Sequence, residues 1–383
     1  MPDDSLVKKK ETFNHYAWYL PRFWHGMTLG VWLTMLARNT FAVSWKRWHL
    51  VAGITPIAFF NTCMSALQSL LYWGRIQKTP DPVSPIFIIG HWRSGTTHLH
   101  ELMIRDPRFG YATTYECFAP SHFLLSEWIA PLLKTMLPEK RPMDNMPAGW
   151  EHPQEDEFAL CNLGVGSPYG RMAFPNHPNY EREYLDPADL TPTQKTRWQA
   201  GLRWFLKCVW RRCGKRLVMK SPPHTARVAA LLEMFPDAKF VHITRDPRAV
   251  YPSTVRLWKS FDNLQGLQIP TFDDLEERVQ TDFVRMYTAF ERDRPLLNDG
   301  NLCEVRYEDL VARPLDEMER IYRTLGIENF EEARGPLETY LNAQKSYQTN
   351  KHTLPGDTEA MLEAKWGPYM RRYGYFEDAA VQA

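Results

Sequence analysis

One short segment constrains the fold of this chain more than any other feature. Residues 85–107 have the sequence PIFIIGHWRSGTTHLHELMIRDP, an apolar β-branched run, two glycines that bracket four residues, and a helix-like continuation. Such a short run, apolar on both faces, is typical of a buried parallel strand. A strand that turns sharply into a helix directs backbone N–H groups and the positive end of the helix dipole at one point. The segment therefore predicts an α/β fold with an anion-binding turn.

The turn differs from an ATP-binding P-loop in the position of its cation. The P-loop pattern GxxxxGK[ST] places a lysine directly after the second glycine. Here Thr96 follows Gly95, and the cation, Arg93, comes before the glycine. Ser94 and Thr97 add hydroxyl groups, and the two glycines allow the backbone to approach a ligand closely. We expect an anion site at residues 93–97; the alternatives are an ordinary βα turn and a degenerate P-loop of a nucleotide kinase or other NTPase.

Strand-like and helix-like patterns alternate along the chain after a proline-rich stretch, KTPDPVSP. This alternation predicts a mostly parallel central sheet with helices on both faces, a P-loop-like three-layer α/β sandwich formed by residues 81–383. Strands are predicted at 85–90, 216–220, 239–245 and 302–310, and helices at 96–106, 225–235 and 249–259.

Residues 1–80 differ in character and predict a separate helical region. The segment 22–39 places its apolar side chains along one side of a helix. The stretch from 50 to 74 carries no charge and is long enough to span a bilayer, although Pro56 and Asn61 interrupt its apolar character. Aromatic and cationic residues flank it, as in interfacial anchors: Trp45, Lys46, Arg47, Trp48, His49, Arg75 and Lys78. Three alternatives stay open, namely packing on the rest of the chain or on a second subunit, contact with a membrane surface, and a membrane span.

The composition excludes several classes of protein. The 46 Lys and Arg residues nearly balance the 45 Asp and Glu residues, so we expect no nucleic-acid partner, and any anion site must be local. Six scattered cysteines without a CxxC pair argue against a disulfide framework and a structural zinc, and they favour a reducing compartment. The start MPDDSLVKKKETF has no apolar signal segment. We therefore expect a cytoplasmic location, at the inner face of a membrane if residues 1–80 touch one, and no bound metal.

Two further motifs occur at the ends of predicted strands. FVHITRDPRAVYPSTVRLW places Arg245 at a strand end and Ser253 eight residues later, and VMKSPPH places Lys220 at the end of another strand. Together with RSGTT, and in this order, the motifs resemble those of sulfotransferases that use 3′-phosphoadenosine 5′-phosphosulfate (PAPS). The resemblance covers roughly residues 85–325 and is nearest to bacterial members, which are related to the tyrosyl-protein and heparan-type enzymes. The pair His91–Trp92 stands where proline is common in that family.

The resemblance implies roles for individual residues. Arg93 and Lys220 would stabilise the bridging oxygen and the transferring group. The 5′-phosphosulfate would be held by Arg93, Ser94, Gly95, Thr96 and Thr97, and the 3′-phosphate by Arg245 and Ser253. Lys351, with His352, would close over the nucleotide as a basic segment does in relatives.

The identity of the general base is left open by the sequence. A base must reach the acceptor hydroxyl and have a pKa near the working pH. Glu116, predicted on the strand or loop after the first helix, is the first choice because tyrosyl-protein and heparan-type relatives place a glutamate there. His224 is the second choice because some cytosolic relatives place a histidine soon after the equivalent lysine. The acidic run in GWEHPQEDEFAL is either a solvated face or a source of groups, Glu155 or Asp156, that orient the acceptor or share the base role.

The function implied by the resemblance is transfer of a sulfuryl group from PAPS to a hydroxyl of a lipid-like alcohol or a saccharide, with release of adenosine 3′,5′-bisphosphate. Two alternatives are a nucleotide kinase or NTPase, against which the missing lysine argues, and a non-catalytic, membrane-associated nucleotide-binding protein. A homo-oligomer is compatible with the sequence.

Overall fold

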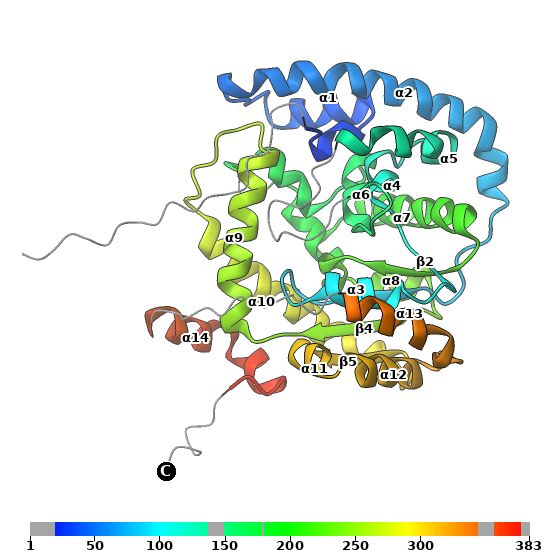
Figure 1. Ribbon diagram of the computed structural model, residues 1–383. Helices are drawn as coiled ribbons and strands as arrows, with labels where there is room; N and C mark the ends of the chain where they lie inside the picture. The colour runs from blue at the N-terminus through cyan, green and yellow to red at the C-terminus, as the bar shows by residue number, and fades with distance from the viewer. Residues whose placement is uncertain (1–19, 137–148, 178–179, 344–355, 377–383) are drawn as a thin grey trace, which may run out of the picture.

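A parallel sheet of five strands forms the centre of the computed structural model, which describes residues 20–136, 149–177, 180–343 and 356–376 (Figure 1). The spatial order is β2-β3-β1-β4-β5, and every neighbouring pair is parallel. The strands are β1 (Ile86–Ile89), β2 (Phe109–Gly110), β3 (Arg216–Lys220), β4 (Lys239–Thr244) and β5 (Leu302–Arg306). The predicted α/β class is confirmed, and three of the predicted strands correspond to β1, β3 and β4.

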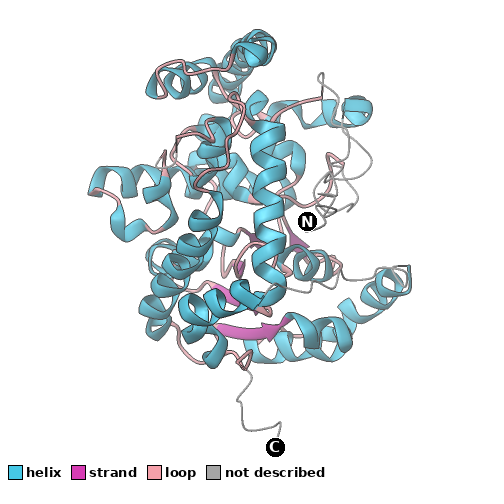
Figure 2. Ribbon diagram, turned by 90° about the vertical axis from the view of Figure 1, so that its left-hand side faces the viewer, coloured by secondary structure: helices cyan, strands magenta, loops and turns pink. Residues whose placement is uncertain are grey.

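Alternating side chains of β1 divide the interior into two apolar cores. Ile86 and Ile88 enter one core, Phe87 and Ile89 enter the other, and all four side chains are buried. Because successive residues of a strand point to opposite faces, a strand that is apolar at every position needs cover on both sides. Helices supply that cover, and Figure 2 shows the strands enclosed among them.

Helices line the two faces unequally. The Ile86–Ile88 core is covered by α3 (Thr96–Met103), α11 (Tyr307–Ala312), α12 (Pro314–Leu325) and α13 (Phe330–Ala343). The Phe87–Ile89 core is larger and takes side chains from α1 (Leu29–Arg38), α2 (Trp48–Gln77), α4 (Thr114–Phe118), α5 (Phe123–Ser126), α6 (Asp156–Leu163), α7 (Pro192–Cys213), α8 (Val228–Met234), α9 (Pro247–Gln265), α10 (Leu275–Asp293) and α14 (Gly356–Arg372).

Two local predictions are wrong. The predicted strand at 302–310 ends at Arg306, and Tyr307 begins α11, whose first turn contains two acidic residues that favour a helix N-terminus. Glu116 lies in a helix, α4, and not on a strand or loop. The cause is a capping box, in which the Thr113 hydroxyl accepts from the Glu116 N–H while the Glu116 carboxylate accepts from the Thr113 N–H.

The N-terminal helices share the larger core. Trp24 and Trp32 are fully buried there, as is Ile54 of α2, together with Phe87 of the sheet. In Figure 1, α2 runs along one edge of the molecule, and α11, α12 and α13 lie toward the opposite edge. The prediction that residues 1–80 contain helices is thus met over the described part, whereas their separation from residues 81–383 as a domain stays a prediction.

Candidate functional site

The sequence motifs meet because of the strand order. In an open parallel sheet, ligands bind outside the carboxyl ends of the strands. β1 lies between β3 and β4, so the turn that follows β1 has the end of β3 on one side and the end of β4 on the other. Lys220 is the last residue of β3, and Arg245 follows β4 directly. The three motifs therefore face one region of the sheet edge.

The turn after β1 has a backbone that few residues adopt. Gly90, Arg93 and Gly95 have φ values of +144°, +69° and +103°, a region that disfavours side chains. A Cβ atom at Gly95 would collide with the ring of Tyr307, so glycine is required there on two counts. Hydrogen bonds from the Gly90 N–H to the Thr225 hydroxyl (2.7 Å) and from the Ser94 hydroxyl to the His91 carbonyl (2.7 Å) fix the turn. Maintaining strained residues in this way is typical of ligand-binding sites.

Arg93, Arg245 and Ser253 form one hydrogen-bonded cluster. Nε of Arg93 donates to Oγ of Ser253 (2.9 Å), and Nη1 of Arg245 donates to the carbonyl of Arg93 (3.1 Å). The guanidinium of Arg245 stacks over the Tyr307 ring, 4.1 Å from its centroid, a contact that holds it in place. Two cations and a hydroxyl from segments about 150 residues apart thus lie beside the strained turn, and they suit a multiply charged anion.

Lys220 connects the turn to the acidic run. Its ammonium donates to the Glu155 carboxylate (2.6 Å) and lies 3.5 Å from the hydroxyl of Thr97 in the first turn of α3. The side chain of Lys220 is buried, whereas that of Glu155 remains partly exposed. A lysine at the end of a strand is commonly solvated, but this one is enclosed and paired with a carboxylate.

Tyr169 completes the surroundings of Glu155. Its hydroxyl donates to the second carboxylate oxygen of Glu155 and accepts from the Trp92 indole N–H (2.7 Å). Burial and the nearby charge of Glu155 raise the pKa of Tyr169 well above its usual value, so the phenol stays a neutral donor. Trp92 belongs to the turn after β1, and Glu155 is therefore connected to that turn through both Tyr169 and Lys220. Tyr169 and Thr225 carry no functional signal in the sequence, because both lie outside the three motifs.

The acidic run is not a solvated face. Each of its three successive carboxylates has a partner from the end of β3 or the segment after it. The pairs are Glu155 with Lys220 (2.6 Å), Asp156 with His224 (2.9 Å) and Glu157 with Arg227 (2.5 Å). The side chains of Asp156 and Glu157 are fully buried. The run lies at the start of α6, where carboxylates favour the helix dipole. Three successive carboxylates thereby join α6 to the segment that follows β3.

Glu116 lies in a different network. Both of its oxygens are used within that network, because Arg212 of α7 donates to each of them, at 2.9 and 3.0 Å, and the Thr113 N–H donates as well. The side chain is fully buried, and this burial raises the pKa of Glu116 while the Arg212 charge opposes the rise. These contacts are those of a helix cap and a buried ion pair.

His224 lies in the larger core. Its ring is fully buried, with Nε2 2.9 Å from Asp156, and it makes T-shaped contacts with the rings of Phe87 and Trp198. Lys351 and His352 lie outside the described residues. In the described part of the chain, no group of three or more His, Cys, Asp or Glu side chains is arranged to hold a metal ion.

Comparisons with known proteins identify the family and the fold. Residues 85–332 match the model of the sulfotransferase family. The omega-hydroxy-beta-dihydromenaquinone-9 sulfotransferase of Mycobacterium bovis is 41% identical over 358 residues, which cover 94% of this chain and 92% of that protein. Human carbohydrate sulfotransferase 3 is 24% identical over 36% of the chain and 34% of its own length. The crystal structure of a Mycobacterium avium sulfotransferase shares the fold with a TM-score of 0.66 at 18% identity, covering 91% of this chain and 96% of that one.

Proposed function

This chain belongs to the sulfotransferase family, and we propose that it transfers a sulfuryl group from PAPS to the hydroxyl of a lipid-like alcohol, releasing adenosine 3′,5′-bisphosphate. Family membership decides against the nucleotide kinase and the non-catalytic binding protein as alternatives. The observation that carries the proposal is the cluster of Arg93, Arg245 and Ser253 beside the turn after β1.

The cluster supports PAPS as the co-substrate because this nucleotide carries anions at two positions of one adenosine. We assign the 5′-phosphosulfate to the backbone N–H groups and hydroxyls of residues 93–97, at the N-terminus of α3. We assign the 3′-phosphate to Arg245 and Ser253. Both the hydroxyl and the backbone N–H of Ser94 donate to the His91 carbonyl, at 2.7 and 3.1 Å, so Ser94 contributes by holding the shape of the turn. Lys351 stays a predicted contributor.

The residues around Lys220 suit the transfer itself. When an acceptor oxygen bonds to sulfur and the bond from sulfur to the 5′-phosphate oxygen breaks, negative charge develops on that leaving oxygen. We assign the stabilisation of this charge to Lys220, which lies near Thr97, and to Arg93 of the turn itself. Preorganised cations of this kind supply much of the catalysis in group transfer. The acceptor proton must leave at the same time, and it needs a base near Lys220.

We propose Glu155 as that base, in place of Glu116 and His224. Glu155 is the carboxylate in contact with Lys220, and it is partly exposed, so an acceptor hydroxyl can reach it. Tyr169 holds its second oxygen and fixes its orientation. Glu116 is enclosed by Arg212 and Thr113, and His224 is enclosed in the core with Asp156.

A lipid-like acceptor is favoured over a saccharide by the extent of the similarities. The relative named for a hydroxylated menaquinone matches nearly the whole chain, whereas the carbohydrate sulfotransferase matches about a third of it. A hydroxyl on a long apolar chain is thus the proposed substrate class. A cytoplasmic location stays a prediction, supported by six cysteines that are all free.

The test is to incubate the enzyme with PAPS labelled in its sulfuryl group and with lipid and saccharide extracts separately. We expect label in an apolar product and adenosine 3′,5′-bisphosphate in equal amount. Label that appears only in saccharides would refute the lipid acceptor, and no transfer with either extract, together with ATP hydrolysis, would refute the proposal as a whole.

A further inference from the structure

We propose that the outward face of α2 docks on an anionic lipid bilayer with the helix parallel to the membrane plane. The α2 outer face is defined here by its exposed apolar side chains: Trp48, Ile57, Phe59, Phe60, Leu67, Leu70, Leu71 and Trp73. The proposal extends the lipid-like acceptor proposed above, but its argument and its test do not depend on turnover.

The α2 helix exposes large apolar side chains while it buries two polar ones. Two of its polar side chains, Asn61 and Gln68, are buried against the body of the protein. Asn61 donates to the carbonyls of His25 and Met27, and Gln68 donates to the carbonyl of Ser121. The outer face meanwhile exposes 59% of Phe59, 80% of Leu70 and 58% of Trp73. Contiguous apolar exposure on this scale marks an interaction surface, because it is unfavourable in water.

Charge identifies the partner as an anionic surface. Asp81 is the first acidic residue after Glu11, whereas six Lys or Arg residues occur between them, in a chain whose net charge is only +1. Lys46 lies beside the N-terminal end of α2, stacked over Trp45, and Arg75 lies near the other end, stacked over Tyr72. Aromatic and cationic side chains at both ends of an uncharged face match the headgroup level of an anionic bilayer. A second copy of this nearly neutral chain offers no comparable attraction.

Packing determines the orientation of the helix. α2 is long and apolar enough to cross a membrane, and it is the one such helix in the described part of the chain. However, it packs along its length on α1, α5 and α7. Leu50, Ile54 and Ile76 bury its inner side from end to end. A perpendicular orientation would therefore carry these neighbours into the bilayer, whereas a parallel one inserts the outer face alone.

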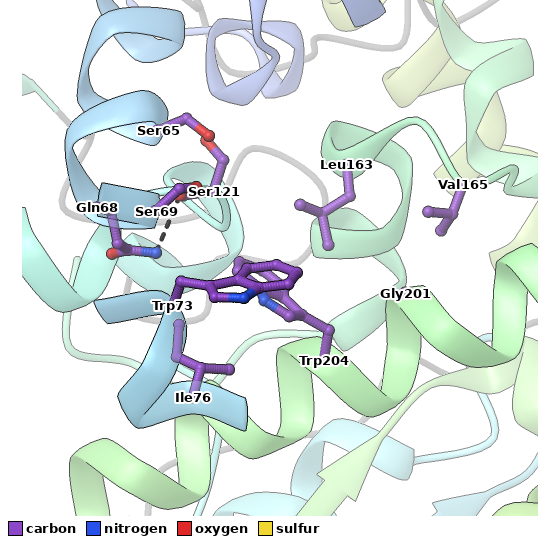
Figure 3. A pocket seen from close by; sticks show the side chains of 10 residues that line it. All are labelled: Ser65, Gln68, Ser69, Trp73, Ile76, Ser121, Leu163, Val165, Gly201 and Trp204. Carbon is purple, nitrogen blue, oxygen red and sulfur yellow. Dashed lines mark hydrogen bonds between the residues drawn. The ribbon is translucent and has the colours of Figure 1, made fainter. Parts of the chain in front are cut away.

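A groove continues this surface into the protein. Figure 3 shows Ser69 and Trp73 of α2 on one side of it and Trp204 of α7 below. Leu163 at the end of α6 and Val165 after it lie on the opposite side. Its volume is about 290 Å³, and its lining is mostly apolar. Because Trp73 is both exposed and part of this lining, the groove opens beside the α2 outer face. An apolar chain leaving the bilayer would meet it first.

Flotation with vesicles tests the proposal. We expect the full chain to float with phosphatidylglycerol-containing vesicles, more than with pure phosphatidylcholine, and Leu70→Glu to weaken this binding about tenfold or more. Val311→Glu is the matched control, since Val311 is also exposed but lies on α11, far from α2 in Figure 1. Calorimetry with adenosine 3′,5′-bisphosphate should give the same affinity for all three proteins, which shows that the variants are folded.

Three results would overturn the proposal. The first is that the full chain does not float with anionic vesicles, and the second is that Leu70→Glu floats as well as the unchanged protein. The third is that light scattering finds, without lipid, a dimer that Leu70→Glu dissociates, which would make the face an interface between copies. Each is distinguishable from failure of the proposed function, because sulfuryl transfer is not measured.

Discussion

Glu116 and Glu155 resemble each other locally and differ in what surrounds them. Each lies at the N-terminus of a short helix, α4 or α6, and each pairs with a cation, Arg212 or Lys220. The side chain of Glu116 is fully buried, whereas 15% of the Glu155 side chain is exposed. Both oxygens of each carboxylate accept hydrogen bonds, so the difference lies in the partners and in access from solvent. Two carboxylates in similar local sequences can therefore suit different roles, because their surroundings differ.

The largest expected effect comes from removing the charge of the proposed base. Glu155→Gln should lower turnover by about 10² to 10⁴ because the amide cannot accept the acceptor proton. The affinity for adenosine 3′,5′-bisphosphate should remain, since Glu155 is not assigned to the nucleotide. Single-turnover transfer from labelled PAPS and calorimetry measure the two quantities.

Glu116→Gln is the matched control for that experiment. It should leave turnover within a few-fold of the unchanged protein while lowering stability by about 1–3 kcal/mol, because Arg212 loses a charged acceptor. If Glu116→Gln abolishes turnover in a stable protein and Glu155→Gln does not, the base is Glu116 and the comparison is reversed.

The next effect concerns Glu157, a carboxylate of the same acidic run as Glu155, to which we assign a structural role and no catalytic one. Glu157→Gln breaks a fully buried pair with Arg227, and it should lower the free energy of unfolding by about 3–5 kcal/mol. Urea unfolding measures this loss. Glu151→Gln, at an exposed position before the run, should change stability by no more than about 0.5 kcal/mol. If the two variants lower the free energy of unfolding equally, the buried pair of Glu157 and Arg227 does not stabilise the fold.

The smallest effect concerns the proposed 3′-phosphate site. Arg245→Ala should weaken the binding of adenosine 3′,5′-bisphosphate by about 1.5–3 kcal/mol, roughly 10- to 150-fold, because a charge-assisted contact is lost. Arg323→Ala, at an exposed position of α12, should leave the affinity unchanged. Calorimetry that finds no difference between Arg245→Ala and the unchanged protein would remove the proposed 3′-phosphate site.

Local patterns were sufficient for the three central strands and for the turn after β1. A strand buried on both faces must be apolar at every position, so the run at 85–90 was identifiable from its residues alone. A positive φ favours glycine, so the glycine at position 95 was a sign of a turn in the sequence. The capping box of Thr113 and Glu116 was also present as a T-x-x-E pattern, and it would have predicted α4 correctly.

The sequence by itself thus determined the fold class, the strands β1, β3 and β4 that carry the motifs, and the family resemblance. Only the tertiary structure placed Glu155 beside Lys220, enclosed His224 in the core, and turned the apolar side of α2 outward. The physical reason is that the hydrogen bonding and the spacing of apolar residues within one helix or strand depend on residues that are close together in the sequence. The pairing of charges and the exposure of a helix face to water depend on contacts between segments that lie tens of residues apart along the chain.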